Sequence, residues 1–359
     1  ILCADRAGFF RGNCLIMNRS TALNYILEGF MKRTFFTVLF GIIISVSAFA
    51  KTSFEIVALG VNGGVIDGNI TSYLIRSTDE NSYLALDAGT LLPGIEKAAA
   101  KGAFKNIAVP ADSPLTLEGY VFKNAVKGYF ISHGHLDHVS GLVISSTDDS
   151  KKNIYALQSV VDVLTNNYFN WKTWPNFSTS GEGFKLGQYT YKVLDPGKET
   201  AIEGTSLFGA ALPLSHSNYE SSMILVRKNK DYFAFFGDTG PDTVEKSTHL
   251  DTVWKTLGPK VKSKNLKGII IEVSYQNGIA DKDLFGHLTP EWLLKELQNL
   301  EKYSGGKGSL KGLNVIISHV KPTLNKNTDI RSSILGQLKN GNTLGVNFIM
   351  LDQGDSMEF

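Results

Sequence analysis

Short runs of alternating or continuous apolar residues dominate the chain from about residue 51 onward, and most are rich in β-branched and aromatic side chains. Runs of this length and composition, bounded by glycine and polar residues, are typical of β-strands. The pattern predicts strands at 56–61, 72–77, 83–87, 126–132, 153–157, 189–194, 207–214, 222–228, 232–237, 267–273, 314–318 and 346–351.

Helical periodicity is confined to fewer stretches, and we predict helices at 93–102, 157–167 and 289–303. The last has Thr289 as its N-cap and Pro290 in its first turn, which is a favourable start for a helix. Strands outnumber helices, and no repeat or linker interrupts them. We therefore expect an α+β fold, with two packed sheets covered by outer helices in a single domain over 51–359.

The first fifty residues have a different pattern. From Met31 a basic start leads into an apolar run over 35–46 and a small-residue motif that ends at Ala50. This predicts a secretory signal peptide over 31–50, with cleavage after Ala50. The apolar run is shorter than the roughly 20 residues that a membrane span needs. We therefore expect a periplasmic or secreted protein with no membrane attachment after cleavage, and we expect 1–30 to be upstream sequence absent from the native protein.

Composition narrows the set of partners. Removing residues 1–50 takes away five Lys or Arg and two Asp or Glu, so that 31 basic residues face 32 acidic ones. A nearly neutral chain lacks the basic surface that nucleic-acid binding requires, and we expect no nucleic-acid partner. Both cysteines, Cys3 and Cys14, also lie in the removed part, which leaves no thiolate for metal binding. The oligomeric state is left open.

Acids and histidines follow directly after several predicted strands. The segment 130–143, FISHGHLDHVSGLV, holds three histidines and an aspartate within six positions. The residues in question are His133, His135, Asp137 and His138, with Asp87, His216, Asp238 and His319 at the ends of other strands. In an extended segment the side chains at i and i+2 point to one side, so the first two histidines can chelate one ion. Asp137 and His138 then face a second position, which makes metal binding the expected chemistry.

The arrangement also carries a family resemblance. The motif H-x-H-x-D-H, followed at long spacing by His, Asp and His, resembles the metallo-β-lactamase superfamily. The longer stretch HGHLDHVSGLVISS resembles the signature of its class II cyclic-nucleotide phosphodiesterases, with Thr147 as a departure from the expected alanine or proline. The segments NYFNWKTWPNF (167–177), IIIEVSYQN (269–277) and FGHLTPEWL (285–293) are similar to that family as well. The resemblance implies a four-layer αββα sandwich.

The superfamily resemblance also implies a ligand set for two divalent ions. The expected ligands are His133, His135 and His216 for one ion, and Asp137, His138 and His319 for the other, with Asp238 bridging them. Ligands with nitrogen and oxygen donors suit Zn²⁺ best but would also accept iron or manganese. Asp87 is expected to orient the histidine loop from behind, and Glu272, at another strand end, is a second candidate for such a role.

The phosphodiesterase resemblance implies hydrolysis of 3′,5′-cyclic nucleotides to 5′-monophosphates, with cAMP as the first candidate substrate and cGMP as a further one. A hydroxide shared by the ions would attack phosphorus in line with the 3′ oxygen, and Asp137 and Asp238 are expected to be catalytic as ligands of those ions. His287, just before the helix N-cap, is the expected proton donor to that oxygen. The aromatic segment suggests base binding by Trp171, Trp174 and Asn170, with packing of the loop as the alternative.

Other readings of the motif remain. Lactonases, glyoxalase-type thioesterases and other phosphodiesterases share H-x-H-x-D-H, so the ligands alone do not separate them. A β-lactamase is disfavoured by His138 and by the missing cysteine ligand. A non-catalytic metal-binding protein would need full coordination with no open position, whereas this ligand set leaves a shared position free.

Overall fold

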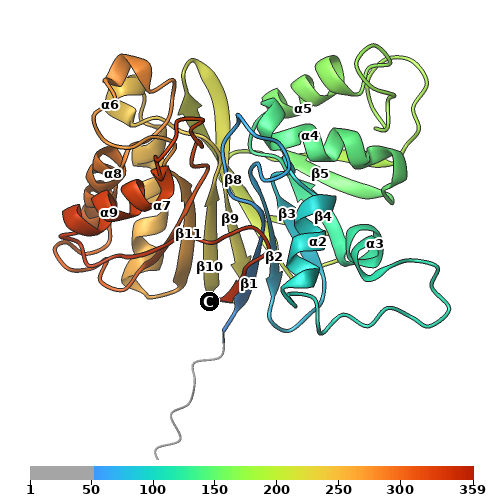
Figure 1. Ribbon diagram of the computed structural model, residues 1–359, viewed down its shortest axis with the longest axis horizontal. Coiled ribbons are helices and arrows are strands. Elements are labelled where there is room, and N and C mark those ends of the chain that lie inside the picture. Colours follow the sequence, from blue (N-terminus) through green and yellow to red (C-terminus); the bar gives the residue numbers. More distant parts are fainter. Residues whose placement is uncertain (1–51) are drawn as a thin grey trace, which may run out of the picture. The chain divides into compact units, whose positions relative to one another are not determined.

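Two seven-stranded sheets face each other at the centre of the fold, and helices cover the outer face of each (Figure 1). In spatial order, the first sheet consists of β14 (Ser356–Glu358), β1 (Phe54–Gly60), β2 (Ser72–Ser77), β3 (Tyr83–Leu86), β4 (Val126–Phe130), β5 (Lys152–Ala156) and β6 (Tyr189–Val193). The second consists of β13 (Asn347–Ile349), β12 (Asn314–Ser318), β11 (Leu266–Glu272), β10 (Asp231–Phe236), β9 (Tyr219–Lys228), β8 (Phe208–His216) and β7 (Thr200–Ala201). The twelve predicted strands are present, while the short strands β7 and β14 were not predicted.

The helices are divided between the two outer layers. On the first sheet lie α2 (Leu92–Ala100), α3 (Leu117–Tyr120), α4 (Leu136–Ser145) and α5 (Gln158–Val163). On the second lie α6 (Asp242–Glu245), α7 (His249–Lys262), α8 (Pro290–Tyr303) and α9 (Ile330–Gly341). The predicted helix 157–167 continues from α5 into a π-helical turn at Leu164–Tyr168. Thr289 caps α8 as expected, since its side chain accepts a hydrogen bond from the Trp292 N–H.

This αββα arrangement confirms the predicted α+β fold class. The coordinates come from a computed structural model that describes residues 52–359. The predictions for the upstream segment 1–30 and for the signal peptide 31–50 lie outside the described residues. Among residues 52–359, no helix is long and apolar enough to cross a bilayer.

Alternate side chains of β10 enter two different layers of the core. The rings of Phe233 and Phe235 point to the first sheet, where their centroids lie 6.0 Å from Phe54 and 6.1 Å from Tyr73. Phe236 points the other way, with its ring 5.3 Å from Trp254 of α7. Because both faces of the strand are buried, its sequence is a continuous apolar run instead of an alternating one.

Strand direction brings the polar strand ends to one edge of the sandwich. β3 runs parallel to β4, while β10, β11 and β12 run parallel to one another. β8 has the same direction as β10 because both pair antiparallel with β9. The carboxyl ends of these strands therefore meet at the upper edge in Figure 1.

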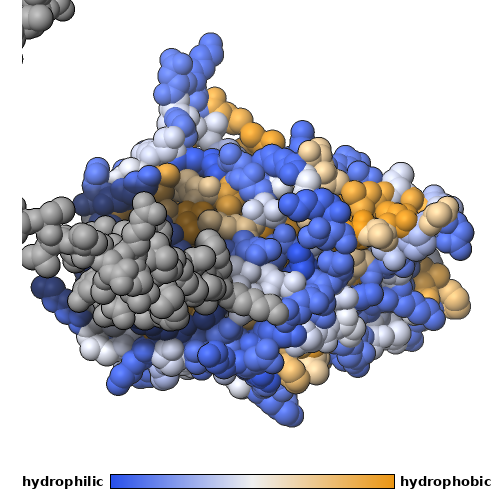
Figure 2. Space-filling view, turned by 90° about the horizontal axis from the view of Figure 1, so that it is seen from below, coloured by the Kyte–Doolittle hydropathy of each residue, from blue (hydrophilic) through white to orange (hydrophobic). Residues whose placement is uncertain are grey.

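The opposite edge is seen in Figure 2. Hydrophilic side chains predominate on its visible surface, and hydrophobic residues occur there in separate patches. Scattered surface hydrophobic residues are ordinary in folded proteins.

Candidate metal centre

A single carboxylate oxygen lies among the ring nitrogens of several histidines. The Oδ2 atom of Asp238, in the turn after β10, is 3.2 Å from Nε2 of His319 and 3.3 Å from Nε2 of His138. The Nε2 atoms of His133 and His216 are both 3.8 Å away. Asp238 is only 2% exposed. Its carboxylate thus occupies the central position that the sequence analysis expected for a shared ligand.

Two clusters of potential ligand atoms flank this carboxylate. One contains His133, His135 and His216, and the other contains Asp137, His138 and His319. Within each cluster the potential ligand atoms lie within 4.8 Å of one another. The fold therefore brings together all seven residues that were predicted as ligands. The two predicted groups are among five overlapping groups of the described residues that could hold an ion, and two of the other groups include His287.

Two of the inner histidine nitrogens lack a hydrogen-bond partner. Nε2 of His133 and Nε2 of His138 are buried and form no hydrogen bond within the described chain. Leaving a buried polar atom unpaired costs about 1–3 kcal/mol. Burial lowers the pKa of His216 to about 4, so its imidazole is neutral at pH 7 and offers a lone pair. A divalent cation would satisfy these atoms, and the nitrogen and oxygen donors fit such an ion.

On the first sheet, Asp87 and Ser132 hold the outer nitrogens of two histidines. Asp87 Oδ2 accepts hydrogen bonds from the Ser132 hydroxyl and from Nδ1 of His138, both at 2.7 Å. Because the Ser132 hydrogen is used in this way, its oxygen accepts from Nδ1 of His133 at 3.0 Å. The Nε2 atoms are thereby aimed into the site, which is the arrangement that metal-binding histidines require. The position of Asp87 agrees with its expected orienting role.

The second sheet repeats this arrangement with Glu272 and Ser274. The Ser274 hydroxyl donates to Glu272 Oε2 at 2.6 Å and accepts from Nδ1 of His319 at 2.9 Å. Glu272 Oε1 accepts from Nδ1 of His287 at 2.7 Å and from the Thr239 N–H at 3.0 Å. A carboxylate and a serine therefore orient two histidines on each side of the centre.

Glycines allow two segments to approach the histidines closely. Gly286 has φ +77°, and its carbonyl accepts a hydrogen bond from Nδ1 of His216 at 2.8 Å. A Cβ atom at Gly286 would lie 2.4 Å from the Ser217 nitrogen. Gly63 is similarly restricted, since a Cβ atom there would lie 2.7 Å from Cε1 of His319. Neither position accommodates a side chain without displacement of the site.

His287 lies beside the ligand clusters and is 3% exposed. Its ring centroid is 4.7 Å from that of His216 and 5.3 Å from that of His319. Burial alone would lower the pKa of His287, but the Glu272 carboxylate and then Asp238 raise it above its ordinary value. His287 therefore lies at the edge of the centre with its Nδ1 held by a carboxylate, and its acid role stays a prediction.

The aromatic segment 167–177 makes most of its polar contacts within its own region. Asn170 Oδ1 accepts from the backbone N–H groups of Lys172 and Thr173. Trp171 Nε1 donates to the Phe184 carbonyl, and Trp174 Nε1 donates to the Ser146 hydroxyl. These contacts resemble loop packing more than an open base site. Base binding by these three residues remains a prediction.

Sequence reasoning missed several residues of the centre. Ser132 directly precedes His133, and Ser274 lies two positions after Glu272, so each has a chemically active neighbour that could have marked it. Tyr219 was also missed, although its ring stacks on His135 with centroids 4.7 Å apart. Serine and tyrosine are common in strands and turns, so sequence proximity is only a weak signal for the two serines, and Tyr219 has no such signal.

Comparisons with known proteins agree with this geometry. The family described as "cAMP phosphodiesterases class-II" matches residues 52–354. A probable 3′,5′-cyclic-nucleotide phosphodiesterase of Yersinia pestis is 55% identical over 322 residues, which cover 89% of this chain and 94% of that protein. A 3′,5′-cyclic-nucleotide phosphodiesterase of Aliivibrio fischeri is 53% identical over 308 residues, with 86% and 93% covered.

Solved structures show the same fold. Unliganded yeast PDE1 superposes with a TM-score of 0.76 at 24% identity, over 86% of this chain and all of that one. The metallo-β-lactamase fold protein YhfI of Bacillus subtilis superposes with a TM-score of 0.55 at 14% identity, again over 86% of this chain and all of that one. The fold, the two ligand clusters and the family match all lead to one assignment. The chain belongs to the class II cAMP phosphodiesterases, which have the metallo-β-lactamase fold.

Proposed function

We propose that this protein hydrolyses 3′,5′-cyclic nucleotides, cAMP first and cGMP as a further candidate, to 5′-monophosphates at a centre of two divalent ions, with Zn²⁺ as the preferred metal. The observation that carries the proposal is the pair of ligand clusters around Asp238. The names of the relatives at 53–55% identity support the substrate class. Lactonase or thioesterase activity has no comparable support.

The proposed ligands are His133, His135 and His216 for one ion, and Asp137, His138 and His319 for the other, with Asp238 between them. Bound divalent ions would stabilise negative charge on the phosphoryl oxygens and lower the pKa of water from 15.7 toward about 7. The chain itself contributes preorganisation, because the outer nitrogens of the histidines are held by Asp87, Ser132 and Ser274. A site held in this way needs little reorganisation when the substrate arrives.

His287 is the proposed general acid. In the reaction the oxygen of water bonds to phosphorus and the bond from phosphorus to the 3′ oxygen breaks, so a proton must reach that oxygen. The hydrogen bond from Nδ1 of His287 to Glu272 leaves Nε2 of the ring as the proton donor. Glu272 raises the pKa of His287 against the effect of burial, which favours the protonated form.

Export is part of the proposal and rests on the sequence pattern at 31–50. A basic start, an apolar run and a small-residue cleavage motif are the parts of a secretory signal peptide. The active form would then begin at Lys51 and act in the periplasm or outside the cell. No membrane or nucleic-acid partner is proposed.

The direct test is incubation of purified protein 51–359 with cAMP before and after chelation, with the product identified by chromatography. We expect release of 5′-AMP that stops on chelation and returns when zinc is added. Release of 3′-AMP would contradict the proposed bond cleavage, and metal-loaded protein that leaves cAMP and cGMP intact would contradict the substrate class.

A further inference from the structure

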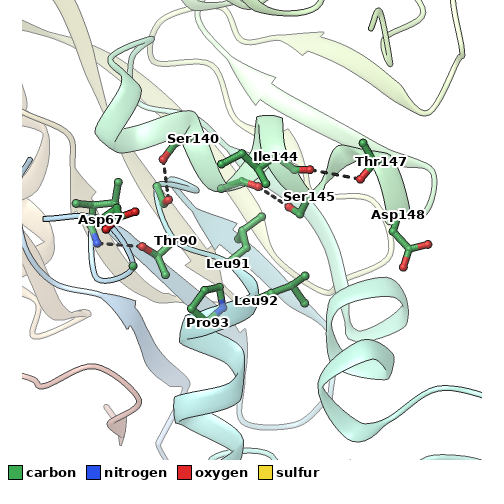
Figure 3. Close-up of a pocket in the computed structure, with 14 residues that line it drawn as sticks. Asp67, Thr90, Leu91, Leu92, Pro93, Ser140, Ile144, Ser145, Thr147 and Asp148 are labelled. Atoms are coloured by element: carbon green, nitrogen blue, oxygen red, sulfur yellow. Dashed lines mark hydrogen bonds between the residues drawn. The ribbon is translucent and has the colours of Figure 1, made fainter. Parts of the chain in front are cut away.

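Two cavities that border the loop joining β1 to β2 differ in their lining. One, of about 380 Å³, is bordered by Asp67, Gly68 and Ile70 of this loop together with α2 and α4 (Figure 3). The other, of about 660 Å³, is bordered by Val65 of the same loop and by the segments after β11 and β12. We call the second the β11–β12 groove, with lining residues Val65, Tyr275, Ile279, Lys321 and Leu324. Either volume lies within the usual range for a small-molecule site.

The β11–β12 groove opens directly beside the metal centre. Ser274, which also lines it, is the residue that orients His319. The ring centroid of Tyr275 lies 5.7 Å from that of His287, the proposed acid. A Cβ atom at Gly63 would lie 2.7 Å from Cε1 of His319 and 3.0 Å from Cγ of Lys321, so both side chains lie against this glycine. A substrate whose phosphate is at the centre would thus have this groove within reach.

The groove combines exposed apolar side chains with one aromatic ring and one ammonium group. Val65 is 64% exposed and Leu324 is 80% exposed, and together with Ile279 they offer apolar surface to a base. Lys321 is half-buried, and its Nζ lies 5.4 Å from the ring centroid of Tyr275. Within residues 52–359 no carboxylate forms an ion pair with this ammonium group. An unpaired cation next to an aromatic ring and apolar side chains suits an anionic nucleotide.

The smaller cavity also has apolar side chains in its lining, but the described residues that line it include no aromatic ring and no cationic group. Figure 3 shows that its hydroxyl groups already take part in hydrogen bonds with backbone atoms. Ser140 donates to the Gly89 carbonyl, Ser145 donates to the Gly141 carbonyl, and Thr90 accepts from the Ile70 N–H. Its two charged lining residues, Asp67 and Asp148, are acidic and would repel a phosphate. The smaller cavity therefore serves as a control site for the experiments below.

We propose that the β11–β12 groove binds the nucleoside half of the substrate, with the base against Tyr275 and the apolar side chains and with the Lys321 ammonium beside the phosphate. The proposal rests on the cyclic-nucleotide activity proposed above. It assigns base recognition to this groove and not to the segment 167–177. Lys321 is a binding residue in this scheme, while proton transfer remains with His287.

The first experiment measures adenosine binding by calorimetry, because adenosine carries no phosphate and is not hydrolysed. The variants are Tyr275→Ala, Leu324→Ser and, as the matched control, Ile144→Ser. Ile144 is also apolar and 66% exposed but lines the smaller cavity. Stacking of a base on an aromatic ring contributes to the free energy of binding. We therefore expect Tyr275→Ala to weaken adenosine binding roughly 10-fold or more. Leu324→Ser should weaken it about 3-fold, and Ile144→Ser should leave it unchanged.

The second experiment compares Lys321→Gln with Lys326→Gln, a nearby exposed lysine that does not line the groove. Loss of a charge-assisted contact should raise KM for cAMP roughly 10-fold in Lys321→Gln. The affinity of Lys321→Gln for adenosine should be unchanged. The KM of Lys321→Arg for cAMP should lie close to that of the wild type. Lys326→Gln should behave as the wild type. Equal losses of adenosine and cAMP binding in Lys321→Gln would refute the phosphate contact.

The outcomes separate this inference from the activity on which it rests. Wild-type protein that binds adenosine but leaves cAMP intact would refute the proposed function and not the groove. Suppose instead that the wild type hydrolyses cAMP, and that Trp171→Ala loses adenosine binding while Tyr275→Ala keeps it. The assignment of base binding to the β11–β12 groove would then be refuted. A similar loss in Ile144→Ser and Leu324→Ser would refute it as well.

Discussion

The Ser274→Ala substitution tests whether the serine of the second sheet supports metal binding. The Ser274 side chain is completely buried, and its oxygen lies 2.9 Å from Nδ1 of His319 and 2.6 Å from Oε2 of Glu272. Without the hydroxyl, the His319 N–H loses its acceptor, while Glu272 Oε2 keeps the backbone donors of Ser274 and Leu288. One buried unpaired donor costs about 1–3 kcal/mol. The lost support for a ligand histidine typically weakens metal binding about 10- to 100-fold.

Ser304→Ala is the matched control for this substitution. The Ser304 hydroxyl is also buried and donates to the Leu300 carbonyl at 2.7 Å, in the turn that ends α8. Zinc affinity would be measured by competition with a chromogenic chelator, and the free energy of unfolding by urea titration of the metal-free proteins. We expect both variants to lose about 1 kcal/mol or more of stability, with weaker zinc binding only in Ser274→Ala. If Ser274→Ala binds zinc as tightly as the control, the reasoning about the carboxylate–serine–histidine arrangement is wrong.

Three further predictions concern the acid, the core and the N-terminus. His287→Ala should slow cAMP hydrolysis about 100-fold or more. It should slow hydrolysis of a nitrophenyl phosphodiester much less, because nitrophenolate leaves without a proton. Equal losses of rate in the two steady-state assays would exclude the acid role. Phe235→Ala removes a fully buried ring between the sheets and should lower the free energy of unfolding by about 3–5 kcal/mol, and a change below about 1 kcal/mol in a urea titration would contradict this packing. Protein from a native source should begin at Lys51, as read by N-terminal sequencing, and any peptide from 1–50 in the secreted fraction would argue against the predicted cleavage.

Local sequence determined the strands and the identity of the candidate ligands. Strands buried on both faces, such as β10 and β11, are continuous apolar runs, and an acid or histidine after such a run stands out. The spacing in HGHLDH also separates its residues into two groups, because His133 and His135 precede α4, with His135 as its extended N-cap, while Asp137 and His138 lie in the first turn of that helix. These features depend on neighbours a few positions away, which a single sequence contains.

Several elements were missed for the same physical reason. Helix α7 has an amphipathic pattern but contains Pro259, which argues against a helix, and burial of Leu250, Val253 and Trp254 against the second sheet stabilises it. Strands β7 and β14 are two and three residues long and exist only through pairing with β8 and β1. Local propensity is too weak to define such elements without their tertiary contacts.

The sequence by itself therefore determined the fold class, the family resemblance and a set of seven candidate ligands, because each follows from periodicity or from a compact motif. Only the tertiary structure decided how those ligands are oriented and where a nucleoside has room. The serines that hold His133 and His319 act across short distances in space. Similarly, Val65, Tyr275 and Lys321 line one groove although they are far apart in the chain. Packing of the two sheets creates these neighbours, and no local pattern in the chain specifies them.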